Sequence, residues 1–358
     1  MVGPDGALPL PWLAPLLKQT LQTQHAHALL LQGPQGVGQF EMAMTLAQAW
    51  LCESTAGAFE HNPCGVCASC RLVQSHSHPD LLVLLPEILQ EALGWGGGDG
   101  AEAATEKTGK AKPSKEIKVE AVRSAVTFAQ TTSARGRGKV VVLHPAERMN
   151  GISANTLLKT LEEPPGAARF VLSCAAPESL LPTIRSRCQA VTMLLPPVDL
   201  ATQWLAQAGV KDAAVLLAAT GGQPQEVLQW VEQGVDAALW QRLPAIVARG
   251  ESQALSTWPL PRLIDALQKL GHDAACVAVG APARYFPQAV IAKGANSDAL
   301  AEWMQELKRC ARHAEHAWNA GLMLESLVQQ GQRALRASAP DAATKTTRGL
   351  VSVHSRAW

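Results

Sequence analysis

Four cysteines crowd into a short part of the chain and could bind a metal ion. They are Cys52, Cys64, Cys67 and Cys70. Two residues separate each of the last three from the next, and this spacing lets thiolates converge on one ion. Four soft sulfur ligands form the tetrahedral donor set of structural Zn²⁺ sites, which leave no ligand position for a catalytic water. The cluster therefore predicts structural zinc; the alternatives are four reduced thiols without a metal or, less favoured, a ligand from His61, His76 or His78.

A glycine-rich segment, residues 33–38, could cradle a phosphate group. Its glycines are Gly33, Gly36 and Gly38, and it lies between a strand-like apolar run and a helix-like stretch. In that setting backbone N–H groups can wrap a phosphate at a helix N-terminus. A working phosphate loop continues with Lys for the β- and γ-phosphates and Ser or Thr for Mg²⁺, whereas this chain has Gln39 and Phe40. The segment is therefore either a degenerate phosphate loop or an ordinary glycine-rich turn.

A second element of nucleotide chemistry also lacks its reactive groups. In ATPases of this architecture, the strand that corresponds to residues 140–143 is followed by Asp-Glu, one carboxylate for Mg²⁺ and one for the attacking water. Here the two positions hold His144 and Pro145. Proline has no basic group, and a single histidine is a poor ligand for a hard cation. We therefore expect this chain to hydrolyse no ATP and to bind neither ATP nor Mg²⁺.

These candidate sites lie in a region where strand-like and helix-like stretches alternate. Strands are expected over residues 27–32, 81–85, 139–144, 169–174 and 189–195, and helices over residues 39–51, 117–130 and 153–163. Alternation of this kind predicts an α/β domain with a doubly wound parallel sheet over residues 1–195, which includes the cysteine module at 52–70. Residues 94–115 have no apolar periodicity and are expected to form a flexible surface insertion.

After Pro196 and Pro197 the pattern becomes helical throughout. We expect a small helical lid domain over residues 196–238 and an all-α bundle over residues 239–337. The polar residues 338–358 are expected to be a disordered tail.

The composition excludes several classes of protein. The 358 residues include 31 Lys and Arg against 30 Asp and Glu, and this net charge of +1 rules out a polybasic nucleic-acid binder. Aromatic residues make up only 4%, which argues against a base-stacking platform. A basic tract between residues 107 and 139 indicates either contact with DNA phosphate or, as favoured here, a solvated surface. No apolar run approaches the roughly 18 residues of a membrane span and no signal peptide is evident, so a cytoplasmic protein without membrane contact is expected.

Two strings further along the chain match a known family pattern. They are Asn155-x-Leu157-Leu158-Lys159-x-Leu161-Glu162-Glu163-Pro164-Pro165 and Ser186-Arg187-Cys188. With the cysteine cluster, the His78-Pro79-Asp80 string and the degenerate loop, they make the chain resemble bacterial clamp-loader subunits of the AAA+ class. The resemblance covers residues 10–230 well and the remaining helical part in outline.

The resemblance implies a non-catalytic (stator) subunit of the DNA polymerase III clamp loader, which helps to place the beta sliding clamp on primed DNA. The implied partners are delta and gamma/tau subunits in a five-membered ring, joined through the C-terminal bundle as a collar. Arg187 would be an arginine finger that stabilises charge on the γ-phosphate of a neighbouring subunit's ATP. The alternative for Arg187 is a cap or an ion pair at the end of its own short helix, and Arg185 is its rival as the finger. Gln225 stands where active members carry a nucleotide-sensing Arg.

Two other functions remain open from the sequence. One is an ATP-hydrolysing motor of the same fold, similar to the gamma/tau subunits, against which Gln39, Phe40 and His144-Pro145 argue. The other is a zinc-containing DNA-binding protein on a decayed AAA+ scaffold, which would bind DNA tightly and with strong salt dependence on its own. No ATPase activity is expected of the isolated chain, although the implied complex belongs to a DNA-directed DNA polymerase, a nucleotidyltransferase.

Overall fold

A parallel sheet of five strands forms the centre of the N-terminal part of the chain. The strands are β1 (Ala28–Gln32), β2 (Leu81–Leu84), β3 (Val140–Leu143), β4 (Arg169–Cys174) and β5 (Gln189–Thr192), and their order across the sheet is β2-β3-β4-β1-β5. Every pairing in the sheet is parallel. The computed structural model describes residues 1–54, 63–95, 113–291, 294–312 and 319–336. His61, the expected tail, the first part of the basic tract and most of the expected insertion over 94–115 lie outside these residues.

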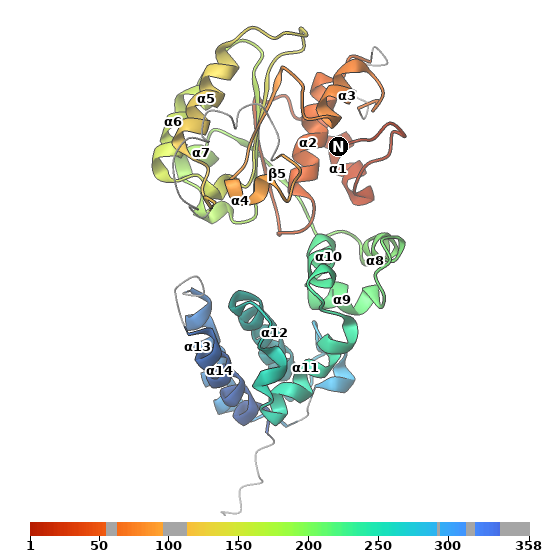
Figure 1. The fold of residues 1–358 in the computed structure, drawn as a ribbon, viewed down its shortest axis with the longest axis vertical. Coiled ribbons are helices and arrows are strands. Elements are labelled where there is room, and N and C mark those ends of the chain that lie inside the picture. Colours follow the sequence, from red (N-terminus) through yellow and green to blue (C-terminus); the bar gives the residue numbers. More distant parts are fainter. Residues whose placement is uncertain (55–62, 96–112, 292–293, 313–318, 337–358) are drawn as a thin grey trace, which may run out of the picture. The chain divides into compact units, whose positions relative to one another are not determined.

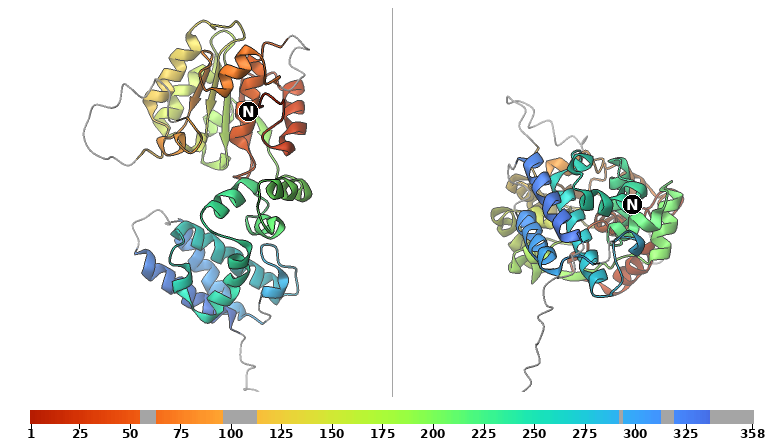
Figure 2. Two further views of the ribbon diagram at one scale, coloured as in Figure 1. Left: turned by 45° about the vertical axis from the view of Figure 1, so that its right-hand side comes forward. Right: turned by 90° about the horizontal axis from the view of Figure 1, so that it is seen from below.

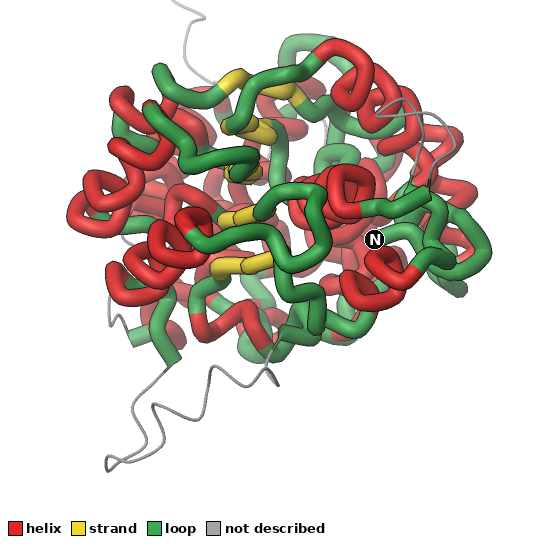
Figure 3. The backbone as a smooth tube through the Cα atoms, turned by 90° about the horizontal axis from the view of Figure 1, so that it is seen from above, coloured by secondary structure: helices red, strands yellow, loops and turns green. Residues whose placement is uncertain are grey.

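Helices cover both faces of the sheet (Figure 1), and the strands lie in a row between them when the molecule is seen from above (Figure 3). The helices α1 (Ala14–Thr23) and α2 (Gln39–Leu51) cover one face, and α5 (Val119–Gln130) and α6 (Gly151–Glu162) cover the other. Alternate residues of β1 supply the two cores: Leu29 and Leu31 pack on the α1–α2 side, and Leu30 packs on the α5–α6 side. A strand that is buried on both faces needs a continuous apolar run, which explains the sequence of β1.

Shorter helices complete the first compact unit of the chain, Met1–Gly234. They are α3 (Ala68–Gln74), α4 (Glu87–Gln90), α7 (Pro182–Arg185), α8 (Val198–Gln207), α9 (Ala213–Ala219) and α10 (Pro224–Glu232), with single 3₁₀ turns at Pro11–Leu13, Ala146–Arg148 and Pro177–Ser179. The sheet and its two helical layers confirm the expected doubly wound α/β fold. The division of this unit into a sheet domain and a lid at residue 196 stays a prediction.

The second compact unit, Val235–Trp358, is a helical bundle (Figure 2). Its helices are α11 (Ala237–Arg249), α12 (Leu260–Ala278), α13 (Ser297–Arg312) and α14 (Ala320–Leu335), with 3₁₀ turns at Ser252–Leu255 and Gln288–Val290. Gly331 of α14 allows a close approach, since a Cβ there would lie 2.6 Å from the ring of the buried Trp303. The described residues of this unit form no strand, which confirms the expected all-α C-terminal part. Among the residues that the structure describes, no helix is long and apolar enough to cross a membrane.

Three predicted boundaries are wrong by a few residues. The last strand ends at Thr192 instead of residue 195, and Leu194 beyond it is 77% exposed. The helix predicted from residue 153 begins at Gly151, because the side chain of Asn150 caps it by accepting a 2.9 Å hydrogen bond from the Ser153 N–H. The helix predicted from residue 117 begins at Val119.

Candidate functional site

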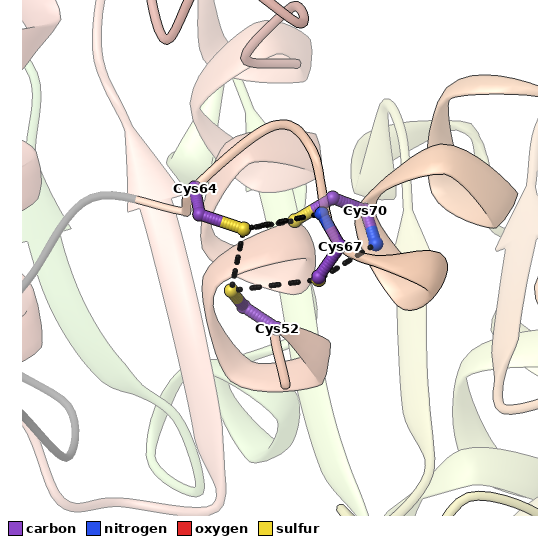
Figure 4. Close-up of side chains that lie close together, drawn as sticks. All are labelled: Cys52, Cys64, Cys67 and Cys70. Carbon is purple, nitrogen blue, oxygen red and sulfur yellow. Dashed lines mark hydrogen bonds between the residues drawn. The ribbon is translucent and has the colours of Figure 1, made fainter. Parts of the chain in front are cut away.

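The four cysteines of the predicted metal site converge (Figure 4). Cys52 directly follows α2, Cys64 lies in the next loop, Cys67 caps the N-terminus of α3, and Cys70 lies in the first turn of α3. The Sγ atom of Cys52 lies 3.6 Å from that of Cys64 and 3.9 Å from that of Cys67, and the Sγ atoms of Cys64 and Cys70 are 3.9 Å apart. A tetrahedron with Zn–S bonds of about 2.3 Å has sulfur–sulfur edges of about 3.8 Å, so the donor set fits Zn²⁺.

Backbone N–H groups within the cluster favour thiolate sulfur. The N–H of Cys67 donates to the Sγ of Cys64 at 3.3 Å, and the N–H of Cys70 donates to the Sγ of Cys67 at 3.4 Å. Burial opposes ionisation, but the N–H groups of Cys67 and Val66 and the neighbouring Cys52 thiol lower the pKa of Cys64 to about 7. Burial raises the pKa of Cys52 and Cys70. Four sulfurs this close can all be thiolates only when a cation neutralises them, which again fits a metal.

The two histidines near the cluster that the structure describes, His76 and His78, bond to other groups. The Nε2 of His78 hydrogen-bonds the Oγ of Ser69 at 3.1 Å, and its Nδ1 accepts from the Asp80 N–H at 3.0 Å. The Nδ1 of His76 hydrogen-bonds the carbonyl of Gly94 at 2.9 Å. These contacts agree with the preference for four cysteine ligands over a histidine substitute.

A buried carboxylate, Asp80, ties the sheet to the cysteine module. Asp80 is fully buried and forms an ion pair with Lys139 at 3.0 Å, and it accepts hydrogen bonds from the N–H groups of Ala134 and Arg135. The guanidinium of Arg135 reaches Glu53, the neighbour of Cys52, with a 2.7 Å hydrogen bond from Nε. The His78-Pro79-Asp80 string is thus a structural anchor, a role that sequence reasoning missed because its partners lie more than fifty residues away.

The glycine-rich loop lies at the carboxyl edge of the sheet, between β1 and α2. Gly36 and Gly38 have φ angles of +75° and +100°, which favour glycine, and a Cβ on Gly33 would lie 2.3 Å from the carbonyl oxygen of Met193. These three positions therefore require glycine, as a phosphate loop or a tight glycine-rich turn would. The loop's position after the first strand, at an edge where the strand order reverses, is where open α/β sheets bind ligands.

The side chain of Gln39 bonds to the glycine-rich loop. It is buried, and its Nε2 donates to the carbonyl oxygens of Gly33 at 2.9 Å and Pro34 at 2.5 Å. The indole N–H of Trp12 donates to the carbonyl of Val37 at 2.8 Å and also holds the loop. At the position where a working phosphate loop has a lysine directed at the phosphates, this chain has Gln39, whose amide bonds to carbonyl oxygens of the loop itself.

A cavity of about 770 Å³ lies beside this loop. The charged residues among its described lining are Glu41, Glu147, Glu226 and Arg148. Gln225, which also lines the cavity, donates a 2.6 Å hydrogen bond to Glu41. Three carboxylates against one guanidinium make the cavity electronegative, which disfavours a triphosphate.

His144, directly after β3, carries a neutral ring. Its Nδ1 shares a 2.9 Å hydrogen bond with the Oγ of Ser173, and its ring lies 5.1 Å from that of Phe40. Burial lowers the pKa of His144 to about 4, so the ring is neutral at pH 7. The positions that would hold metal and activate water in an ATPase therefore carry a neutral ring and a proline.

Arg187 follows the short helix α7 and is held by its own chain. Its Nε donates to the Oε1 of Glu162 at 2.7 Å, its Nη2 pairs with the same oxygen, and its Nη1 donates to the carbonyl of Thr183 at 2.9 Å. The bond to the Thr183 carbonyl joins Arg187 to its own short helix, as the alternative role of Arg187 describes, whereas the ion pair joins it to Glu162 at the end of a different helix, α6. The rival Arg185 is exposed.

Comparisons with known proteins identify the family. The model of the family described as "DNA polymerase III, delta subunit" matches residues 12–196. The DNA polymerase III subunit delta' of Pseudomonas aeruginosa is 36% identical over 71% of this chain and 74% of its own length. The chain belongs to the DNA polymerase III delta-prime family.

Other relatives among the subunits of DNA polymerase III agree with this assignment. The delta' subunit of Escherichia coli is 31% identical over 75% of this chain and 78% of its own length. The tau subunit of Salmonella typhimurium is 34% identical over 45% of this chain and 21% of its own length. The expected relationship to subunits of DNA polymerase III is thereby confirmed, and the delta-prime relatives match the larger share of the chain.

Proposed function

We propose that this delta-prime family chain is the non-catalytic stator of a cytoplasmic DNA polymerase III clamp loader. In this role it joins delta and gamma/tau subunits in a five-membered ring and helps to load the beta sliding clamp on primed DNA. Family membership supports the assembly. The observation that carries the non-catalytic role is the side chain of Gln39, which occupies the phosphate loop and bonds to its carbonyl oxygens.

Three features together argue that the chain binds no ATP. The loop has no lysine to meet the β- and γ-phosphates, and Phe40 replaces the hydroxyl that would hold Mg²⁺. His144 is neutral and followed by Pro145, so neither metal binding nor water activation has a suitable group. The carboxylates of Glu41 and Glu147 line the cavity where the phosphates would lie. An active motor of the gamma/tau type is therefore disfavoured.

Arg187 is proposed to serve the ATP of a neighbouring subunit. It is the central residue of the Ser186-Arg187-Cys188 string that resembles the family's arginine finger, and its guanidinium is always charged and can fork to two phosphate oxygens. Its side chain is 29% exposed, so it is accessible from outside the chain. Charge of this kind, supplied in trans, stabilises the γ-phosphate in the transition state.

The cysteine cluster is proposed to hold structural Zn²⁺. Cys52, Cys64, Cys67 and Cys70 would complete its coordination, so the ion would stabilise the fold of the module and leave no position for substrate. The four thiolates would be held in place by the ion, and the N–H groups of Cys67 and Cys70 would orient two of the sulfurs.

A nucleotide titration of the isolated chain tests the stator assignment, with a purified gamma/tau-type subunit as the positive control. We expect no heat of binding when ATP–Mg²⁺ is titrated to about 1 mM. A dissociation constant of about 1 mM corresponds to a free energy of binding of only about 4 kcal/mol. In parallel, the chain should co-purify with the other loader subunits. Micromolar ATP binding, or failure to enter the complex, would contradict the proposal.

A further inference from the structure

The guanidinium of Arg187 is bound from two sides by residues of its own chain. Glu162, the last residue of α6, accepts from both Nε and Nη2 of the guanidinium on one oxygen, Oε1. Thr183 in α7 accepts from Nη1 at 2.9 Å. The side-on edge of a guanidinium, formed by Nε and one Nη, is one of the edges with which arginine forks to carboxylate or phosphate. In this conformation that edge is occupied.

We propose that Glu162 is a positioning residue that withholds Arg187 until a neighbouring subunit presents a triphosphate. This inference rests on the proposed arginine-finger function and deepens it. The carboxylate of Glu162 and the γ-phosphate compete for the same guanidinium edge, so Arg187 exchanges one anion for another when it engages. Since a nucleoside triphosphate carries more negative charge than one carboxylate, the phosphate displaces Glu162 when both are within reach.

The exposure of the pair sets how strongly Glu162 can compete. The side chains of Arg187 and Glu162 are 29% and 48% exposed, so water screens their attraction. Partly exposed ion pairs of this kind change an equilibrium by no more than about fivefold, which corresponds to about 1 kcal/mol. The pair is therefore strong enough to bias the position of Arg187 and weak enough to open on ATP binding.

The test is a cycle of four reconstituted clamp loaders: wild type, Glu162→Gln, Arg187→Ala and the double variant. The measured quantity is the turnover that depends on Arg187, obtained by subtracting the turnover of the corresponding Arg187→Ala complex at each ATP concentration. We expect Glu162→Gln to lower the KM of this component about two- to fivefold, because the carboxylate competes with ground-state binding of the triphosphate. The kcat should stay within twofold.

Glu163→Gln is the matched control. Glu163 is the adjacent carboxylate, and among the described residues it forms no ion pair. The Glu163→Gln variant should therefore leave KM unchanged. A Glu162→Gln variant that only loosened the fold would lower the midpoint of thermal unfolding and reduce kcat, and neither change is expected of a positioning role.

The possible results separate this inference from the function on which it rests. If Arg187→Ala turns over ATP like wild type, the arginine-finger function itself is wrong. If Arg187→Ala loses turnover but Glu162→Gln leaves or raises KM, only the role of Glu162 is wrong. If Glu162→Gln changes turnover equally with and without Arg187, Glu162 acts independently of the finger and the inference is overturned.

Discussion

The substitution Asp80→Asn should destabilise the first unit of the chain far more than its small chemical change suggests. Asp80 is fully buried and pairs with Lys139, whose side chain is 8% exposed. It also accepts hydrogen bonds from the hydroxyl of Ser133 and from the N–H groups of Ala134 and Arg135 at 2.8–2.9 Å. Asparagine keeps the shape but removes the charge, so the ammonium of Lys139 stays buried without its counter-charge.

Removing one partner of a buried ion pair costs about 3–5 kcal/mol, and the amide of asparagine should put this variant near 3 kcal/mol. With a urea m-value of about 3 kcal/mol/M, the midpoint of unfolding should fall by roughly 1 M. Glu53→Gln is the matched control, because Glu53 pairs with Arg135 of the same loop while both side chains are 31% exposed. A partly exposed pair contributes at most about 1 kcal/mol, so its midpoint should fall by no more than about 0.3 M.

Urea unfolding, followed by circular dichroism over a range of pH, measures the loss of stability in Asp80→Asn and in Glu53→Gln. Burial alone would raise the pKa of Asp80, but the Ala134 N–H, Lys139 and the Arg135 N–H hold this pKa below its usual range. Since the folded pKa lies below the unfolded value of about 3.9, the stabilisation is complete above that value and is lost as the pH falls through the folded pKa. The difference in free energy of unfolding between wild type and Asp80→Asn should be constant from pH 5 to 8 and should decrease in acid. If the midpoint of Asp80→Asn shifts no more than that of Glu53→Gln, or if the difference in free energy of unfolding from wild type increases in acid, the buried charge of Asp80 does not stabilise the fold as argued.

Three further outcomes are expected. Removing the proposed zinc ion from the reduced protein with a chelator should speed hydrogen exchange in α3 and around Cys64, because a short cysteine-rich loop has little core of its own, while β1, β3 and β4 keep their protection. Equal protection with and without the chelator would argue against a structural ion. Gln39→Lys should not create ATP binding at micromolar concentration in calorimetry, since Phe40 and the acidic cavity remain. Asp273→Ala should lower the thermal midpoint of the second unit by several degrees, because the fully buried Asp273 accepts from the N–H groups of residues 284–286; an unchanged midpoint would show that this loop is held by its packing alone.

Local patterns predicted the sheet well because its strands are short apolar runs bounded by breakers. The predicted strand over 169–174 and the predicted helix over 39–51 match β4 and α2. The convergence of the cysteines was also predictable, because two-residue spacing keeps Cys64, Cys67 and Cys70 within seven residues of the chain. The N-terminus of α6 was misplaced because Asn150 was not recognised as its cap.

The side-chain networks could not be predicted, because their partners lie far apart in the sequence. Glu162 and Arg187 are separated by twenty-five positions, and the pair forms only when α6 and α7 pack together. The position of Gln39 shows a different limit: the sequence predicted the loss of the lysine, but not that the replacing amide would bond to the loop's own carbonyl oxygens. The sequence shows which residues differ from a working phosphate loop, and the structure adds the contacts that Gln39 makes in place of the lysine.

The most direct test of the central claim is the DNA-stimulated ATP turnover of a reconstituted clamp loader that carries Arg187→Ala in this chain. Arg185→Ala is the matched control, since Arg185 lies two positions away and is exposed. We expect both variants to fold and assemble and Arg185→Ala to keep full turnover, whereas Arg187→Ala should lose at least the turnover of the one ATP site that the finger serves. Full turnover in the Arg187→Ala complex would contradict the claim that this chain acts on a neighbour's nucleotide.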